Sequence, residues 1–214
     1  MNRNEQLIQE ARAFAERLFA ADHSGHDFMH TLRVHDLAAR IAREEGADET
    51  IARLAALLHD ADDRKLFPAT HETLGNARRF LQENSVPKET EERIYAIIRD
   101  LSFSVGRVPD TLEGQAVQDA DRLDAIGAIG IARVFAYGGA HGRPIHLPEE
   151  AANPDMTPKE YAARTSTGIN HFYEKLLLLK DRMNTAAGRR IAEGRHRFME
   201  AYLAEFMDEW EGKR

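Results

Sequence analysis

The chain has 214 residues, enough for one substantial domain, and its 43% hydrophobic and 30% charged content is ordinary for a globular protein. A net charge of −7 argues against binding to long nucleic acids, which relies on clustered Lys and Arg. It leaves room for a small phosphorylated ligand, because a bound metal ion can supply local positive charge. The absence of cysteine excludes disulfides and thiolate metal ligands.

The N-terminal stretch is amphipathic and carries acidic residues, so it lacks the continuous apolar core of a signal peptide. No apolar run approaches the roughly 20 residues that span a bilayer. We therefore expect a cytoplasmic protein with no membrane partner. Composition says nothing about its oligomeric state.

Apolar residues recur at helical spacing along most of the chain, and no run of alternating β-branched residues interrupts them. The pattern predicts an all-α fold, with residues 1–214 forming a single domain. The first helix should bury Leu7, Ala11, Phe14 and Leu18. In the second, His30 shares a stripe with Val34, Leu37 and Ile41. Further helices are expected at about 49–62, 70–81, 87–101, 112–137, 158–184 and 185–210. The Gly- and Pro-rich segment 138–157 is expected to be a loop, whose role stays open.

Four polar residues lie within these apolar stretches: His30, the adjacent His59 and Asp60, and Asp121. Buried His and Asp are costly unless they have a partner, and a divalent metal ion would serve all four. Each feature also has an ordinary explanation. A single His on an apolar face is usually a core residue, and the dipeptide His-Asp also occurs at 26–27 and 35–36. His35 points about 140° away from His30 on a helix, so we expect it to be a solvated or cap-side residue.

The order of three segments favours the metal site: H-x-x-R-V at 30–34, A-A-L-L-H-D at 55–60 and D-A-D-R-L at 119–123. Together they resemble the signature of the HD superfamily of metal-dependent phosphohydrolases. The strings GHDFMHTLRV, ALLHDADDRKLF, QDADRLDAIGAIGIARVF and INHFYEKLLLLKDRMNT resemble a subfamily of short, stand-alone bacterial and archaeal HD hydrolases, over about residues 22–210.

This resemblance implies an all-α HD bundle with a metal site between helices, and an activity on nucleoside triphosphates. It implies that one divalent ion, most favourably Mn²⁺, binds His30, His59, Asp60 and Asp121. Mg²⁺, Fe²⁺, Co²⁺, Ni²⁺ and Zn²⁺ suit the same donor types.

Other polar residues are candidates for catalysis or substrate binding. Asp63, three residues after Asp60, matches an acid that orients the attacking water in several HD phosphohydrolases, although an exposed helix-end Asp is an equal alternative. Arg64 and Lys65 suit phosphate contacts, or merely balance the acidic run before them. The further candidates are His26 and Asp27 near the first ligand, and His171 and Lys175 on the substrate side together with Arg143, His146 and Tyr173. An ordinary surface loop and helix would explain these last residues equally well. Asp124 would support a ligand or pair with Arg122 or Arg33.

The expected function is hydrolysis of a small nucleotide by a metal-activated water, with Asp63, His26 and Lys65 in catalytic roles. Two alternatives remain. A two-iron oxygenase on this scaffold would need extra His ligands between Asp60 and Asp121, where the chain offers only His71. A non-catalytic metal- or nucleotide-binding module would show no turnover.

Overall fold

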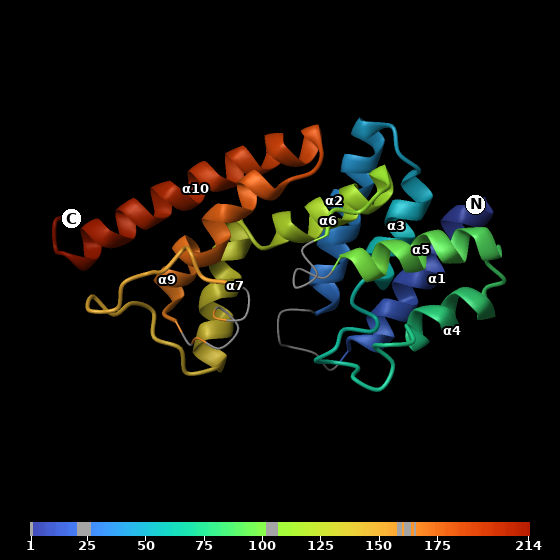
Figure 1. Ribbon diagram of the computed structural model, residues 1–214, viewed down its shortest axis with the longest axis horizontal. Coiled ribbons are helices and arrows are strands. Elements are labelled where there is room, and N and C mark those ends of the chain that lie inside the picture. Colours follow the sequence, from blue (N-terminus) through green and yellow to red (C-terminus); the bar gives the residue numbers. More distant parts are fainter. Residues whose placement is uncertain (1, 21–26, 102–106, 158–159, 161–163, 165) are drawn as a thin grey trace. The chain divides into compact units, whose positions relative to one another are not determined.

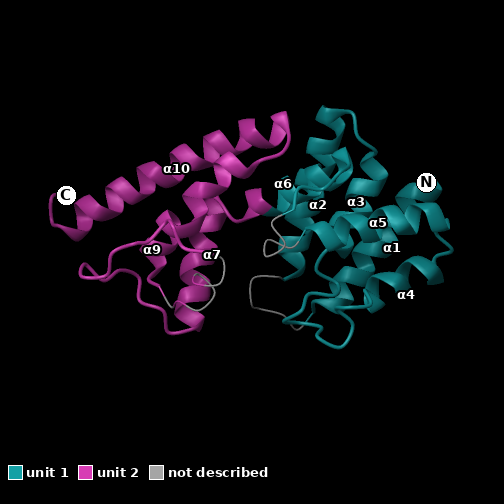
Figure 2. Cartoon of the chain, viewed as in Figure 1, with its two compact units in different colours: residues 1–121 teal, residues 122–214 magenta. Residues whose placement is uncertain are grey.

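The computed structural model describes residues 2–20, 27–101, 107–157, 160, 164 and 166–214. Within these ranges the regular structure is helical and contains no strand, which confirms the all-α prediction. The chain divides into two compact units, residues 1–121 and residues 122–214 (Figure 2). That the two units act as one domain stays a prediction.

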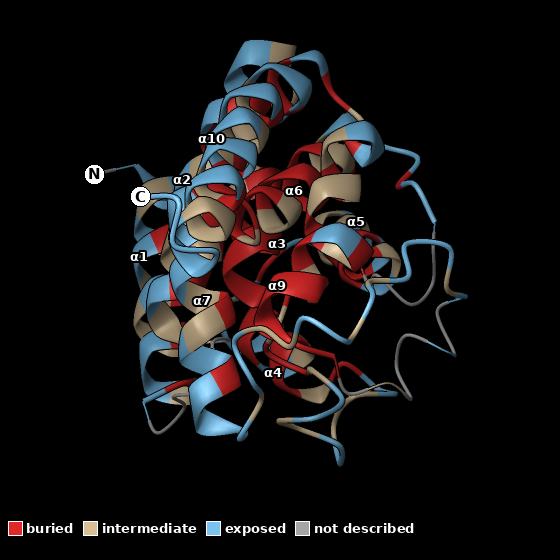
Figure 3. Cartoon of the chain, turned by 90° about the vertical axis from the view of Figure 1, so that its left-hand side faces the viewer, coloured by how far each residue is buried: buried red, intermediate tan, exposed pale blue. Residues whose placement is uncertain are grey.

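The first unit is built around a central helix, α3, that is buried along almost its entire length (Figure 3). Its second half, residues 54–58, is apolar on every side, as expected of a segment enclosed by other helices. The helices of this unit, shown in Figure 1, are α1 (Arg3–Leu18), α2 (Phe28–Glu45), α3 (Glu49–Leu58), α4 (Gly75–Glu83), α5 (Lys88–Asp100) and the greater part of α6 (Leu112–Asp124).

The buried face of α1 differs from the predicted one. Ile8, Ala11 and Ala15 are buried, and Phe19 continues this stripe beyond the helix end. Of the predicted set only Ala11 is fully buried, and the others are half-buried. Both stripes share Ala11 and have helical spacing, so periodicity alone does not decide which one faces the core.

The third helix ends earlier than predicted. It stops at Leu58, and His59 is its C-cap, followed by a series of turns. The next helix starts at Gly75 rather than near residue 70, after Leu74 takes a left-handed conformation with φ of 53°. The His59–Asp60 pair therefore lies at a helix end, from which both side chains can reach one point.

The predicted helix 112–137 is two helices, α6 and α7 (Gly127–Ala140), and the second lies in the second unit. The break occurs at Gly127, whose φ of 77° is strained for any residue with a Cβ atom. A Cβ here would also lie 2.9 Å from Cγ of Arg195.

In the described residues no single helix is long and apolar enough to cross a bilayer. Taken together, α6 and α7 meet these length and composition criteria as a bent pair.

The second unit ends with helical segments of changing pitch. Within the predicted helix 158–184, the regular segments among the described residues are shorter and begin at Gly168. They are α9 (Gly168–His171), the π-helical η1 (Phe172–Leu176) and the 3₁₀-helical η2 (Leu177–Arg182). The last helix is α10 (Ala186–Trp210), close to its predicted range.

Candidate metal centre

The four predicted metal ligands converge within the first unit. Nε2 of His30 lies 3.5 Å from a carboxylate oxygen of Asp60 and 3.5 Å from one of Asp121. Nε2 of His59 lies 3.2 Å and 4.0 Å from the same two oxygens. One donor atom from each of His30, His59 and Asp121 can be chosen so that all lie within 4.8 Å of one another. Residues up to 91 positions apart in the sequence thus meet at one point.

Local structure aims each imidazole at this point. His30 is buried in the first turn of α2, where its backbone N–H donates to the Asp27 carboxylate at 2.7 Å. This bond caps the helix. The ring of His59 is fixed by its Nδ1, which lies 2.8 Å from the carbonyl oxygen of Ala56. A carbonyl only accepts, so Nδ1 carries the hydrogen and Nε2 of a neutral His59 presents a lone pair.

That lone pair faces negative charge. Nε2 of His59 is buried and makes no hydrogen bond of good geometry within the described structure, while carboxylate oxygens of Asp60 and Asp121 lie close by. A lone pair opposite two carboxylates is repulsive unless a cation lies between them. Burial by itself would lower the pKa of His59, but the Asp60 and Asp121 carboxylates outweigh it and raise the pKa to about 9. The cluster therefore attracts positive charge.

A divalent metal ion fits this donor set. Two imidazole nitrogens and two carboxylates suit first-row divalent metals, and an imidazole whose Nδ1 donates to a carbonyl is oriented as metal-binding histidines usually are. Asp121 is 38% exposed and Asp60 14%, so the carboxylate side of the cluster opens toward solvent. A small ligand can approach from there.

Three aspartates follow His59 closely and have different environments. Asp60 belongs to the cluster. Asp62, which sequence reasoning missed, is 3% exposed and accepts hydrogen bonds from the backbone N–H groups of Asn76 and Ala77, at the start of α4. Asp63 is half-buried, and its Oδ1 accepts from the N–H groups of Lys65 and Leu66. Its catalytic role stays a prediction, and the structure adds a turn-capping role.

The other predicted site residues have varied positions. The side chains of Arg64 and Lys65 are exposed on the turn after the cluster. Asp27 caps α2, and a substrate contact would be additional to this role. His26 lies outside the described residues. His171 and Lys175 belong to the second unit, where burial lowers the pKa of His171 to about 3, helped by the charges of Lys175 and Arg143.

One expectation about a nearby polar residue is wrong, and another residue gains a partner that the sequence did not suggest. His35 is 9% exposed rather than solvated, because α3 and α1 cover its side of α2 and supply it with polar partners. Asp124 is buried and pairs with Arg133, since the chain turns at Gly127 and continues into α7, and its expected support of a metal ligand stays a prediction.

The structure is thus an all-α fold with a His–Asp cluster that could hold a metal ion, and comparison with known proteins gives its family. The HD domain profile matches residues 27–126, which span the four candidate ligands. YpgQ of Bacillus subtilis (strain 168) is 41% identical over 195 residues, which cover 89% of this chain and 87% of YpgQ.

Comparison with solved structures points to the same family. A Lactobacillus plantarum protein has a TM-score of 0.83 at 40% identity, over 97% of this chain and 98% of the other. An HD-superfamily hydrolase from Bacillus thuringiensis has a TM-score of 0.75 at 40% identity, with the same coverage. B. subtilis YpgQ in complex with ADP has a TM-score of 0.77 at 33% identity, over 97% of each chain. The chain belongs to the HD superfamily of hydrolases, as its sequence motifs predict.

Proposed function

We propose that this protein hydrolyses small nucleotides, with (deoxy)nucleoside triphosphates as the favoured substrates, and that His30, His59, Asp60 and Asp121 hold one divalent metal ion, most favourably Mn²⁺. The observation that carries the proposal is the position of the His59 ring. Its Nδ1 is committed to Ala56, and its Nε2 faces two carboxylates across a gap suited to a cation.

The nucleotide part of the proposal rests on a relative. B. subtilis YpgQ, similar over nearly the whole chain, has been crystallised with ADP. A nucleoside phosphate combines a compact polyanion with a base and a sugar, and a metal ion with a few nearby cations can balance its charge. The net charge of −7 favours such a compact ligand over a long nucleic acid.

The residues of the first unit have distinct roles in this proposal. When bound, a divalent ion polarises a phosphoryl oxygen and lowers the pKa of a coordinated water. The Asp63 carboxylate would orient the attacking water and accept its proton. Arg64 and Lys65, exposed on the turn that follows, offset phosphate charge. Asp27 holds His30 through the helix cap and so fixes one ligand.

The test is a substrate panel of dNTPs, NTPs, nucleoside monophosphates, a nonspecific phosphate ester and an oligonucleotide. Each is incubated with the protein and Mn²⁺, Mg²⁺, Co²⁺ or Ni²⁺, and the products are separated by anion-exchange chromatography. We expect triphosphates to be cleaved, and the products to show whether pyrophosphate or orthophosphate leaves. The His59→Gln variant should abolish turnover. The matched control is His141→Gln, which replaces an exposed histidine of the second unit and should preserve turnover.

Two results would overturn the proposal. Cleavage of oligonucleotides alone would exclude the small-nucleotide class. No cleavage of any phosphate ester under any metal would favour a two-iron oxygenase or a binding module. The oxygenase would need further histidine ligands, and His71 is not part of the His30, His59 and Asp121 group found among the described residues.

A further inference from the structure

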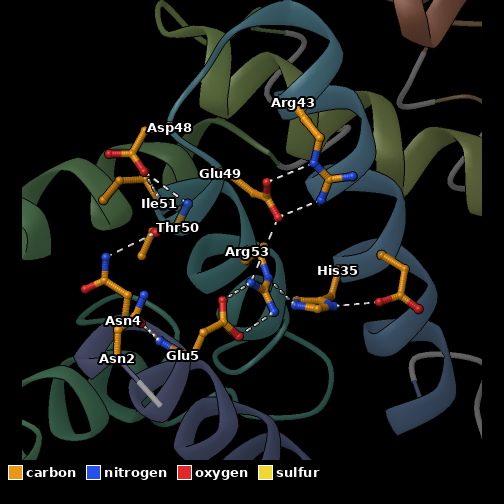
Figure 4. A network of polar contacts seen from close by, with 11 residues as sticks. Asn2, Asn4, Glu5, His35, Arg43, Asp48, Glu49, Thr50, Ile51 and Arg53 are labelled. Atoms are coloured by element: carbon orange, nitrogen blue, oxygen red, sulfur yellow. Dashed lines mark hydrogen bonds and ion pairs between the residues drawn. The ribbon is translucent and has the colours of Figure 1, made fainter.

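A polar network joins the helices that carry the two histidine ligands, at some distance from the metal centre. Arg53 on α3 is its hub (Figure 4). Its Nε donates to Nε2 of His35 on α2 at 3.1 Å, and its Nη1 donates to Glu5 on α1 at 2.6 Å. The Arg53 side chain is only 16% exposed, so these bonds are largely shielded from solvent. They tie three helices of the first unit together.

The bonds of His35 require one protonation state. Arg53 Nε only donates, so Nε2 of His35 must accept and therefore carries no hydrogen. The hydrogen lies on Nδ1, which donates to the Asp36 carboxylate at 2.8 Å. A protonated His35 would direct an N–H at the guanidinium N–H and place two positive charges side by side. The network is therefore intact only while His35 is neutral.

The groups around His35 reinforce this requirement. Burial lowers the pKa of His35, and the positive charges of Arg53 on α3 and Arg12 on α1 act in the same direction. Asp36, on the same helix, opposes them. Among the described residues, Arg53 also contacts two acids. Glu5 pairs with it closely, and Glu49 lies 3.9 Å away while also accepting from Arg43.

The network is placed where it can act on the metal centre. His35 is five residues after His30 on α2, and Arg53 is six residues before His59 on α3. At a rise of about 1.5 Å per residue, the Arg53–His35 bond lies roughly 8–9 Å along each helix from its ligand. It thus sets the alignment of α2 against α3 without touching a ligand.

We propose that the Glu5–Arg53–His35 network is a pH-sensitive lock that positions His30 and His59 for metal binding, and that protonation of His35 opens it. The metal-binding part of this inference rests on the proposed function. His35 and Arg53 are positioning residues, since they act through the two helices rather than on substrate.

The test measures Mn²⁺ affinity of the full chain between pH 7.5 and 5, by electron paramagnetic resonance of free Mn²⁺. Arg53→Met removes the hub and should weaken binding at pH 7.5 by about tenfold, the lower end of what losing a ligand-orienting partner costs. His35→Gln keeps a carbonyl acceptor for Arg53 but cannot be protonated. It should match wild type at pH 7.5 and bind more tightly than wild type at pH 5.

The two effects are linked quantitatively. Protonation of the metal ligands weakens binding equally in all variants. The ratio of the wild-type Kd to the His35→Gln Kd therefore measures only the effect of His35 protonation on Mn²⁺ affinity. This ratio should rise from about 1 as pH falls, toward the factor that Arg53→Met costs at pH 7.5. Arg40→Gln is the matched control, because it removes an exposed ion pair with Glu44 on the same helix. It should behave as wild type.

Three results would overturn the lock: an Arg53→Met variant that binds Mn²⁺ as wild type does, a ratio that stays flat across the pH range, or an equal effect of Arg40→Gln. If Arg53→Met does not fold, or if the chain binds no Mn²⁺, the tautomer of His35 in the wild-type protein provides a second test.

Nitrogen-15 NMR at neutral pH should show that Nδ1 of His35 carries a hydrogen and that Nε2 carries none. The opposite tautomer would exclude the lock, whereas absence of Mn²⁺ binding alone would refute only the proposed ligand set.

Discussion

At the scale of residues, the acidic run after His59 shows how neighbours with the same side chain take different roles. Asp60 joins the two histidines, Asp62 accepts from the start of α4, and Asp63 caps the turn that follows. The three carboxylates lie within four residues, so small differences in backbone direction decide their chemistry. Substitutions at these positions should therefore separate metal binding, stability and turnover.

Asp63→Asn tests the role of this side chain as a base. The amide keeps an oxygen for the N–H groups of Lys65 and Leu66, so folding should change little, but it cannot take a proton. We expect kcat to fall by about 10² to 10⁴, the usual contribution of a general base, with metal content unchanged. Asp63→Ala, the matched variant, should lose the turn cap as well and cost about 1 kcal/mol of stability. Full activity in Asp63→Asn would remove this residue from the mechanism.

His171 provides a prediction about pH. Its pKa is about 3 in the folded protein, against an ordinary value of 6.5. Below pH 6.5 the unfolded chain takes up a proton that the folded chain does not, so the contribution of His171 to stability is present above pH 6.5 and is lost as pH falls toward 3. Wild type should lose more stability on acidification than His171→Gln, by at most about 1.4 kcal/mol per pH unit. Chemical denaturation at pH 7, 6 and 5 measures this difference, and parallel slopes would contradict it.

At the scale of elements, the end of α3 determines the geometry of the site. Adjacent side chains on a regular helix point about 100° apart. His59 keeps helical dihedral angles as the C-cap of α3, and from this helix end His59 reaches Asp121 while Asp60 reaches His30. The anchor of this turn is Asp62, which joins it to α4 through two backbone hydrogen bonds.

Asp62→Ala should therefore destabilise the protein by about 3 kcal/mol or more, because it leaves two N–H groups at the start of α4 without their acceptor in a buried place. Asp62→Asn keeps one acceptor oxygen and should cost less. Urea unfolding of both variants, with chelator present to remove any metal contribution, gives the comparison. Equal stability of Asp62→Ala and wild type would show that the buried bonds are replaced by water or by rearrangement.

At the scale of the whole molecule, sequence predicted the helical class and the residues that meet at the cluster. It succeeded because helical periodicity is local and because the ordered segments around His30, His59–Asp60 and Asp121 resemble the HD signature. It failed where the outcome depends on packing between distant segments. The break at Gly127 is an example, since the apolar pattern continues through it and only the approach of Arg195 shows why glycine is needed there. The burial of His35 likewise depends on Arg53 and Glu5, residues 18 and 30 positions away.

The central claim is that His30, His59, Asp60 and Asp121 bind one divalent ion, and direct Mn²⁺ titration tests it most simply. Equilibrium dialysis of wild type and of the single variants His30→Gln, His59→Gln, Asp60→Asn and Asp121→Asn gives the stoichiometry and the affinity of each. We expect one Mn²⁺ per wild-type chain, and much weaker or absent binding in every variant. Two ions per chain, none at all, or an unchanged affinity in the His59→Gln variant would contradict the account.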